Sequence, residues 1–300
     1  MDLRHLAYLV ALAREGHFGR AARTCGVSQP TLSSGIRRLE TELGFPVVRR
    51  THRFEGLTPE GERVLEWARQ ILADVDGLEA EVEALHGGLS GQLRLGAIPT
   101  SLPCVSLLTT PLLRRHPGIT VAVYSLNSRQ IERGLDEFEL ELGVTYLDSE
   151  PLRGVRTVAL YREQYVLLTD ADGPFGERND VSWAEAATLP LCLLSGDMQN
   201  RRIVDSIFHE AGAEPRPQVE TNSISTLLAH VRDGPWSSVM ANAWLHGSEP
   251  PPGMRAIPLV GPATTRTIGL VWLDREPEPM LARALLDVAA TVDVEEELRR

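Results

Sequence analysis

The apolar positions of residues 3–44 repeat with the spacing of three short helices. The first predicted helix places Leu6, Leu9 and neighbouring apolar residues on one face, and the second covers residues 18–25. Gly26 then supplies the residue type best able to adopt a left-handed turn conformation. In the third helix, apolar residues recur at Leu32, Ile36, Leu39 and Leu43. The pattern predicts two helices joined by a tight turn, supported by a helix that precedes them.

The polar face of the third predicted helix carries small hydroxyls, an amide and guanidinium groups. Ser28 is a suitable N-cap, and Pro30 falls in the first turn, where its missing N–H costs little. Hydroxyl, amide and guanidinium groups are those that contact base edges and phosphates. Each could instead be a cap or part of a solvated surface, but their combination favours a DNA-binding helix. The candidate DNA-contacting residues here are Ser28, Gln29, Pro30, Thr31, Ser33, Ser34 and Arg37.

Short apolar strands within residues 45–57 flank a basic tip, as in the wing of a winged helix. Arg53 at this tip is a candidate for insertion into the minor groove. Thr58 and Pro59 then form a helix start, with Thr58 as the N-cap. The domain predicted from these elements spans residues 1–58.

Residues 59–86 form one long helix with a heptad seam. A helix packed within one domain could show the same seam, but the glycine-rich segment 87–91 favours a dimerising linker helix followed by a hinge. The seam residues are Val64, Ala68, Ile71, Val75, Leu78, Val82 and Leu85.

From residue 92 onward, predicted strands alternate with predicted helices to the end of the chain. This alternation predicts an α/β domain over residues 92–300, with mainly parallel sheets.

The distribution of charge reconciles DNA binding with a net charge of −11. Residues 1–58 hold nine Arg against five acidic residues, and residues 59–86 hold two Arg against eight. Basic charge is therefore concentrated in the module expected to meet phosphates. No apolar run approaches the roughly 20 residues of a membrane helix, which together with the absence of a signal-peptide pattern predicts a cytoplasmic protein with no membrane partner.

The three cysteines, Cys25, Cys104 and Cys192, lie far apart in the sequence and lack metal-ligand spacing. Buried reduced thiols are the expectation, and a redox switch between Cys104 and Cys192 is the alternative. Neither a cofactor nor a metal is predicted. An enzyme is a second possible class, but no nucleophile elbow or P-loop is found. A purely architectural DNA-binding protein is the third class, which the large α/β region disfavours.

The N-terminal sequence LRHLAYLVALAREGHFGRAARTCGVSQPTLSSGIRRLETELG resembles the LysR-type transcriptional regulators, and GQLRLGAIPT and LLRRHPGITVAV resemble their effector-binding domain. The resemblance implies a winged helix-turn-helix, a linker helix, and a two-lobed α/β domain similar to periplasmic binding proteins. It also implies a homodimer or homotetramer on double-stranded DNA, with RNA polymerase as a further partner. Ser34 and Gly35 depart from the large polar residue often found there in the family, and Gly35 costs roughly 0.5–1 kcal/mol relative to Ala.

The resemblance places an effector site between a first lobe at 92–162 plus 268–300 and a second at 163–267. Strand ends and helix N-termini in such a cleft favour anions, so a small organic acid is the expected effector. A redox or uncharged signal, or no ligand, remains the alternative, and the polar residues could simply cap helices. The candidate effector-binding residues are Thr100, Ser101, Leu102, Asn127, Ser128, Thr145, Tyr146, Ser195, Thr221 and Asn222.

Overall fold

The computed structural model describes residues 1–50, 54–246 and 250–298. Its contacts divide the chain into two compact units, residues 1–88 and 89–300, each of which has its own hydrophobic core.

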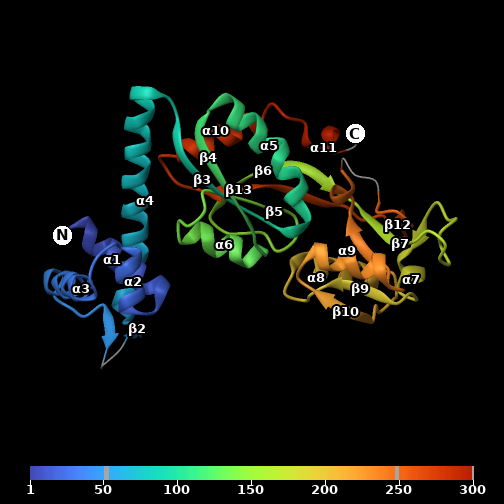
Figure 1. Cartoon of the computed structure of the whole chain (residues 1–300), viewed down its shortest axis with the longest axis horizontal. Coiled ribbons are helices and arrows are strands. Elements are labelled where there is room, and N and C mark those ends of the chain that lie inside the picture. Colours follow the sequence, from blue (N-terminus) through green and yellow to red (C-terminus); the bar gives the residue numbers. More distant parts are fainter. Residues whose placement is uncertain (51–53, 247–249, 299–300) are drawn as a thin grey trace. The chain divides into compact units, whose positions relative to one another are not determined.

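Three helices form the body of the N-terminal unit: α1 (Leu3–Glu15), α2 (Phe18–Thr24) and α3 (Gln29–Leu43) (Figure 1). Their apolar stripes meet in a core that includes Leu9, Leu12 and Leu32, all fully buried. Gly26 has a φ of 66°, and the Ser28 hydroxyl accepts from the Thr31 N–H. The predicted glycine turn and serine cap are confirmed.

Strands β1 (Val48–Arg50) and β2 (Phe54–Leu57) pair antiparallel and form the wing. A carboxylate oxygen of Glu40 on α3 accepts from the backbone N–H groups of Val47 and Val48, at 3.1 and 3.2 Å. This contact ties the base of the wing to the third helix.

Helix α4 (Pro59–Gly87) begins at the predicted cap, where the Thr58 hydroxyl accepts from the Gly61 N–H at 2.9 Å. Gly61 is required there because a Cβ atom would lie 2.0 Å from the Val47 carbonyl oxygen. The two halves of α4 differ in their surroundings. Ala68 and its neighbours pack against the core of the N-terminal unit, whereas Leu78, Val82 and Leu85 are 62%, 45% and 82% exposed.

The first lobe of the C-terminal unit is a five-stranded sheet in the order β4-β3-β5-β13-β6. Helices α5 and α10 lie on one face of this sheet and α6 on the other (Figure 1). Its elements are β3 (Ser90–Ala97), η1 (Pro99–Ser101), α5 (Leu102–Arg115), β4 (Gly118–Ser125), α6 (Ser128–Asp136), β5 (Leu142–Tyr146), β6 (Val155–Glu163), β13 (Arg266–Leu273), α10 (Met280–Ala289) and α11 (Val294–Glu297). Strand β3 begins inside the segment expected as a hinge.

The expectation of mainly parallel sheets is wrong. Strand β3 is parallel to β4 and β5, but β13 returns from the second lobe and pairs antiparallel with β5 and β6. In the second lobe, β7 pairs antiparallel with β11 and β12. Strand direction depends on where the chain re-enters each sheet, and local periodicity carries no information about that.

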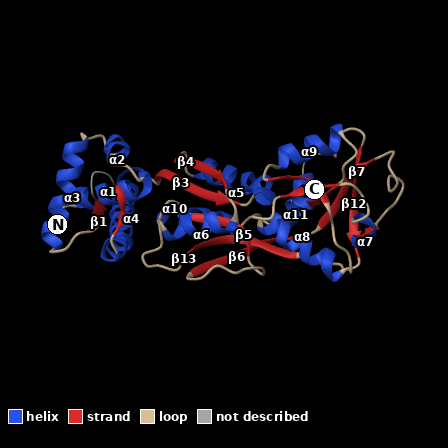
Figure 2. Ribbon diagram, turned by 90° about the horizontal axis from the view of Figure 1, so that it is seen from below, coloured by secondary structure: helices blue, strands red, loops and turns tan. Residues whose placement is uncertain are grey.

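The second lobe contains a four-stranded sheet in the order β11-β7-β12-β8 and a parallel pair, β9 and β10. Strands β7 and β12 of the four-stranded sheet are labelled in Figure 2. Its elements are β7 (Tyr165–Asp170), β8 (Val181–Ser182), α7 (Trp183–Ala186), β9 (Leu191–Leu194), α8 (Gln199–Glu210), β10 (Pro217–Thr221), α9 (Ile224–Asp233), β11 (Ser238–Ala241), η2 (Asn242–Leu245) and β12 (Met254–Val260).

The chain crosses between the lobes twice. At the first crossing a single residue, Gln164, separates β6 from β7. Its backbone N–H donates to Asn242 Oδ1 at 3.0 Å, and its carbonyl accepts from the Asn242 N–H at 2.9 Å. The second crossing is the segment 261–265. The end of β6 and the start of β7 therefore lie at a fixed junction.

Candidate DNA interface and effector site

The polar face of α3 is open to solvent. Gln29, Pro30, Thr31, Ser34 and Arg37 are exposed, and Ser33 is half-buried. The opposite face of the same helix supplies Leu32, Ile36 and Leu39 to the core. The structure thus presents the predicted DNA-contacting side chains together on one helix surface. Ser28 is partly committed to its role as a cap, and its hydroxyl lies 2.8 Å from that of Thr31.

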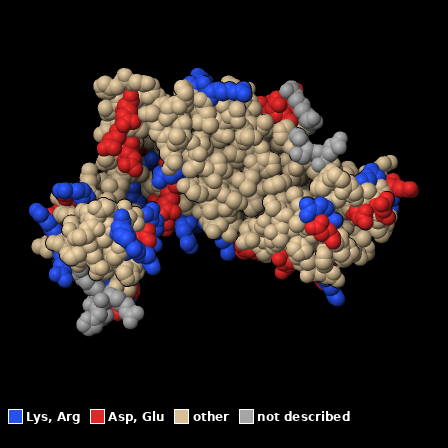
Figure 3. Space-filling model, viewed as in Figure 1, with Lys and Arg blue, Asp and Glu red and all other residues tan. Residues whose placement is uncertain are grey.

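The predicted wing arginine, Arg53, lies outside the described residues. Its neighbour Arg49 donates through Nε to the Leu57 carbonyl at 2.7 Å, which braces the two wing strands. Basic side chains occupy several sides of the N-terminal unit, while acidic side chains lie along the upper part of α4 (Figure 3).

A buried polar cluster lies where the two lobes meet, and we call it the junction cluster: Thr100, Tyr146, Glu163, Tyr165 and Asn200. The Tyr146 hydroxyl donates to Glu163 Oε1 at 2.6 Å and accepts from Asn200 Nδ2 at 2.9 Å. The Thr100 hydroxyl lies 3.5 Å from the same Tyr146 oxygen. Tyr146 and Thr100 come from the first lobe and Asn200 from the second, so Tyr146 links the lobes through one oxygen.

Glu163 is the charged group at the centre of the junction cluster, and its side chain has no exposed surface. Desolvation raises the pKa of this carboxyl to about 7, although hydrogen bonding from Tyr146, and to a smaller extent from Tyr165 and Thr100, acts in the opposite direction. The second oxygen, Oε2, and the buried hydroxyl of Tyr165 have no partner at full hydrogen-bond geometry among the described residues, but the two groups are close enough for each to shift the pKa of the other. Such buried groups carry a desolvation cost that a ligand with matching donors or acceptors would relieve.

Further contacts join the lobes around the junction cluster. The Gln199 amide donates to the Ser149 carbonyl, and Arg202 pairs with Glu150 through two contacts of 2.7 and 2.6 Å. Trp244 Nε1 donates to the Pro99 carbonyl at 3.1 Å. Together these contacts hold the N-terminus of α8 and the η2 turn of the second lobe against the first.

The other predicted effector-binding residues have local roles in the structure. Ser101 donates to the Ile98 carbonyl, Asn127 forms a capping box with Gln130, and Ser195 donates to Asp197 at 2.6 Å. Thr145 is buried beside Tyr146, and its hydroxyl has no partner among the described residues. The remaining positions are Leu102 at the start of α5, Ser128 at the start of α6, Thr221 at the end of β10, and Asn222 after it.

Sequence reasoning missed Glu163, Tyr165 and Asn200. A signal was present, because Glu163 is an acidic residue between two apolar strands in the sequence LYREQYVLL. A charged residue between two strands is either exposed at a turn or buried in a functional site, and the sequence pattern does not distinguish the two.

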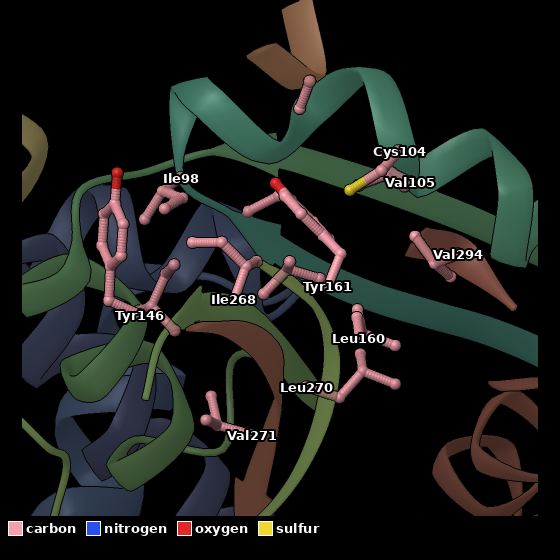
Figure 4. Close-up of a cluster of buried hydrophobic side chains, with 14 of the residues drawn as sticks. Ile98, Cys104, Val105, Tyr146, Leu160, Tyr161, Ile268, Leu270, Val271 and Val294 are labelled. Atoms are coloured by element: carbon pink, nitrogen blue, oxygen red, sulfur yellow. The ribbon is translucent and has the colours of Figure 1, made fainter. Parts of the chain in front are cut away.

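Cys104 and Cys192 are poorly suited to redox chemistry. Cys104 and Cys192 are 1% and 0% exposed, and burial raises their pKa values to about 12 and about 11. The Cys104 thiol points from α5 into the apolar cluster, towards Tyr161 (Figure 4). The two residues belong to different hydrophobic clusters. The thiolate is the reactive form of cysteine, and both sites suppress it.

Within the described ranges, no helix is both long and apolar enough to cross a membrane. Nor do these ranges bring three or more His, Cys, Asp or Glu side chains together as a metal site.

Comparisons with known proteins agree with both halves of the structure. Residues 3–62 match the family described as bacterial regulatory helix-turn-helix protein, lysR family, and residues 86–293 match the LysR substrate binding domain. The DNA-binding transcriptional dual regulator OxyR of Escherichia coli (strain K12) is 32% identical over 278 residues, which cover 92% of this chain and 91% of that protein. The structure of a full-length, singly substituted OxyR from Pseudomonas aeruginosa has a TM-score of 0.76 and 29% identity, covering 98% and 99% of the two chains. CbnR in complex with its target DNA shares the fold, with a TM-score of 0.67 and 23% identity over 97% of this chain and 99% of that chain.

Proposed function

This chain belongs to the LysR family of bacterial transcriptional regulators, and from that premise we propose that it responds to an uncharged, hydrogen-bonding small molecule bound at the junction cluster. The chain is a DNA-binding transcriptional regulator with an effector-binding domain. Its relatives are regulators rather than enzymes. The observation that carries the proposal is the unpartnered Oε2 atom of fully buried Glu163, between two lobes.

The chemistry of the junction cluster favours a ligand that donates hydrogen bonds. An ionised Glu163 would attract N–H or O–H donors and repel a carboxylate, because two like charges in a desolvated site disfavour each other. A small organic acid could enter only with uptake of a proton. The cluster therefore favours the uncharged alternative, while the organic acid stays a prediction that the same experiment tests.

A redox signal is the other alternative, since one relative is named hydrogen peroxide-inducible genes activator. Peroxide oxidises cysteine through the thiolate. The raised pKa values of Cys104 and Cys192 leave very little thiolate at neutral pH. We therefore assign the signal to ligand binding rather than to a switch between these two thiols.

The proposal extends to the partners. Ser28, Gln29, Pro30, Thr31, Ser33, Ser34, Arg37 and Arg53 would contact double-stranded DNA. The exposed end of the α4 seam would pair two copies of the chain, in a dimer or tetramer. RNA polymerase would be the downstream partner. These assignments are supported by the exposed polar face of α3, by the exposed apolar residues of α4, and by the fold shared with a DNA-bound regulator.

The experiment is calorimetric titration of the full chain with matched acid and amide pairs, such as formate with formamide and lactate with lactamide, at pH 6 and pH 8. We expect the amide of a pair to bind, with an affinity that increases as pH rises through 7, because ionised Glu163 is the better acceptor. The Glu163→Gln variant should lose that pH dependence.

Two other results of the titration would lead to different conclusions about the effector site. An acid that binds more tightly at pH 6 than at pH 8, with the same loss in Glu163→Gln, would establish the junction cluster but reverse the ligand class. An acid or amide whose binding is unaffected by Glu163→Gln would place the effector site elsewhere.

A further inference from the structure

A surface pocket of about 430 Å³ lies between α1 and α3 of the N-terminal unit. Helix α1 contributes Arg4, His5 and Tyr8, and α3 contributes Thr31, Ser34 and Arg38 along one stripe. The α1 residues have no role in the assignments made above. The pocket is thus a feature of the DNA-binding domain that the recognition helix alone does not explain.

Gly35 forms the floor of the pocket and sets its depth. A Cβ atom at this position would lie 2.6 and 2.8 Å from the Tyr8 ring and 3.1 Å from His5 Cδ2. The absence of a side chain therefore lets Tyr8 and His5 approach the backbone of α3. The adjacent Ser34 is also small, so the mouth of the pocket stays open where a longer side chain would close it.

The lining offers donors and cations to an anion. It contains two guanidinium groups, three hydroxyls (one of them the Tyr8 phenol) and an imidazole, and no carboxylate among the described residues. His5 Nδ1 is buried and has no hydrogen-bond partner within that part of the chain. Guanidinium groups flanked by hydroxyls recognise the tetrahedral oxygens of phosphate.

Two carboxylates lie outside the lining and hold the guanidinium groups in place. Asp2 accepts from Arg4 Nε and Nη2, with the shorter contact at 2.8 Å, and this pairing lowers the pKa of Asp2 to about 2. Glu42 Oε1 lies 3.6 Å from Arg38 Nε. Each guanidinium has five N–H donors, so these contacts leave donors for a phosphate.

The position of the pocket indicates the source of the phosphate. Thr31 and Ser34 also belong to the exposed face of α3 that is expected to enter the major groove. An α-helix with its side chains is about 10–12 Å across, and the major groove is about 12 Å wide. The flank of such a helix therefore lies beside a phosphate backbone.

We propose that the pocket between α1 and α3 binds one DNA backbone phosphate, held by Arg4 and Arg38, which makes the N-terminal end of α1 part of the DNA interface. This assignment adds a contact to DNA binding and is independent of the effector site. Phosphates position a protein on the duplex and carry no sequence information. The contact should therefore add affinity for all sequences equally.

The test measures how salt affects binding of the full chain to a fluorescein-labelled duplex of mixed sequence, by fluorescence anisotropy. The slope of log K against log salt concentration is negative, and loss of one phosphate contact should make it shallower by about 0.9. We expect the full change when Arg4→Gln and Arg38→Gln are combined, a partial change in each single variant, and retention of the slope in Arg38→Lys. Arg14→Gln, an exposed arginine at the other end of α1, is the matched control and should keep the slope of the unsubstituted chain.

Slopes in Arg4→Gln and Arg38→Gln that match the control would overturn the proposal. A second measurement separates DNA phosphate from a free anion, by comparing thermal unfolding in inorganic phosphate and in chloride at equal ionic strength. Stabilisation by phosphate that depends on Arg4 and Arg38, with unchanged DNA slopes, would assign the pocket to a free anion instead. Reduced slopes would support the DNA assignment.

Discussion

At the scale of single residues, Glu163 shows how burial decides what a carboxyl group does. The group is on the last residue of β6 and has no exposed surface, and desolvation is the largest influence on its pKa. A carboxyl that titrates near neutral pH can exchange a proton when a ligand or a neighbouring side chain changes. Its protonation state is therefore coupled to any ligand that binds at the proposed effector site.

The first prediction concerns stability and Glu163. Because its folded-state pKa is raised from 4.5 to about 7, the stabilising protonated form is complete below pH 4.5 and is lost as pH rises through 7. At 1.36 kcal/mol per pKa unit, the free energy of unfolding should fall by about 3 kcal/mol over this range from this group. Glu163→Gln should remove that fall, measured by urea denaturation at pH 4.5 and pH 8.

The control for this prediction is Glu62→Gln, which removes a carboxyl from the exposed surface of α4. If Glu163→Gln and Glu62→Gln show the same dependence on pH, the buried carboxyl does not titrate in the way assigned here.

The second prediction concerns Gly35, whose helix-breaking tendency is offset by the approach of Tyr8. In Gly35→Ala, overpacking against the Tyr8 ring should exceed the gain in helix propensity and destabilise the N-terminal unit by about 1–3 kcal/mol. Gly77→Ala in α4 is the control, because its Cβ would meet nothing within 4 Å. Gly77→Ala should stabilise by about 0.5–1 kcal/mol. Chemical denaturation monitored by circular dichroism measures both, and a stabilised Gly35→Ala would contradict the packing described.

At the scale of elements, the two halves of the α4 seam have different surroundings. Its first half completes the core of the N-terminal unit, so Ala68 is buried without any partner chain. Leu78, Val82 and Leu85 continue the same spacing but remain exposed. The sequence shows one uninterrupted heptad pattern, and the structure separates the part that stabilises the fold from the part available to a second copy.

The third prediction follows from that separation. Leu85→Asp and Leu78→Asp should weaken self-association by burying a charge at the pairing surface, while leaving the folded chain intact. Sedimentation velocity should show smaller species than for the unsubstituted protein, and Glu79→Ala beside the seam serves as control. Ile71→Asp is a poorer probe, because Ile71 also packs against the core of its own unit. Unchanged assembly in both leucine variants would place the self-association surface elsewhere.

The elements themselves were largely predictable, because their signals are local. The Ser28 cap, the Gly26 turn and the start of α4 each depend on a few adjacent residues. The junction cluster was not predictable, because its partners come from distant parts of the chain. Glu163 and Asn200 lie 17 and 54 positions from Tyr146 in the sequence. Only the folded topology brings them to one hydroxyl.

At the scale of the whole molecule, charge and chemistry are divided between the two units. The N-terminal unit carries the basic and small polar side chains of a DNA-binding surface, whereas the C-terminal unit buries its polar cluster between lobes. A ligand at the junction cluster can change contacts between lobes without touching DNA. An effect on transcription therefore requires that a change in lobe contacts be passed along the chain or between copies.

The first crossing between the lobes limits the form that such a change can take. Only Gln164 separates β6 from β7, and consecutive Cα atoms are about 3.8 Å apart, so the two strand ends cannot be drawn away from each other. The second crossing spans 261–265, and five residues can extend over roughly 17 Å. The first link is short enough to act as a pivot, whereas the second has the length to accommodate a change in the separation of its ends. The response to a ligand would therefore be a rotation of one lobe about Gln164. The displacement of each atom would increase with its distance from Gln164.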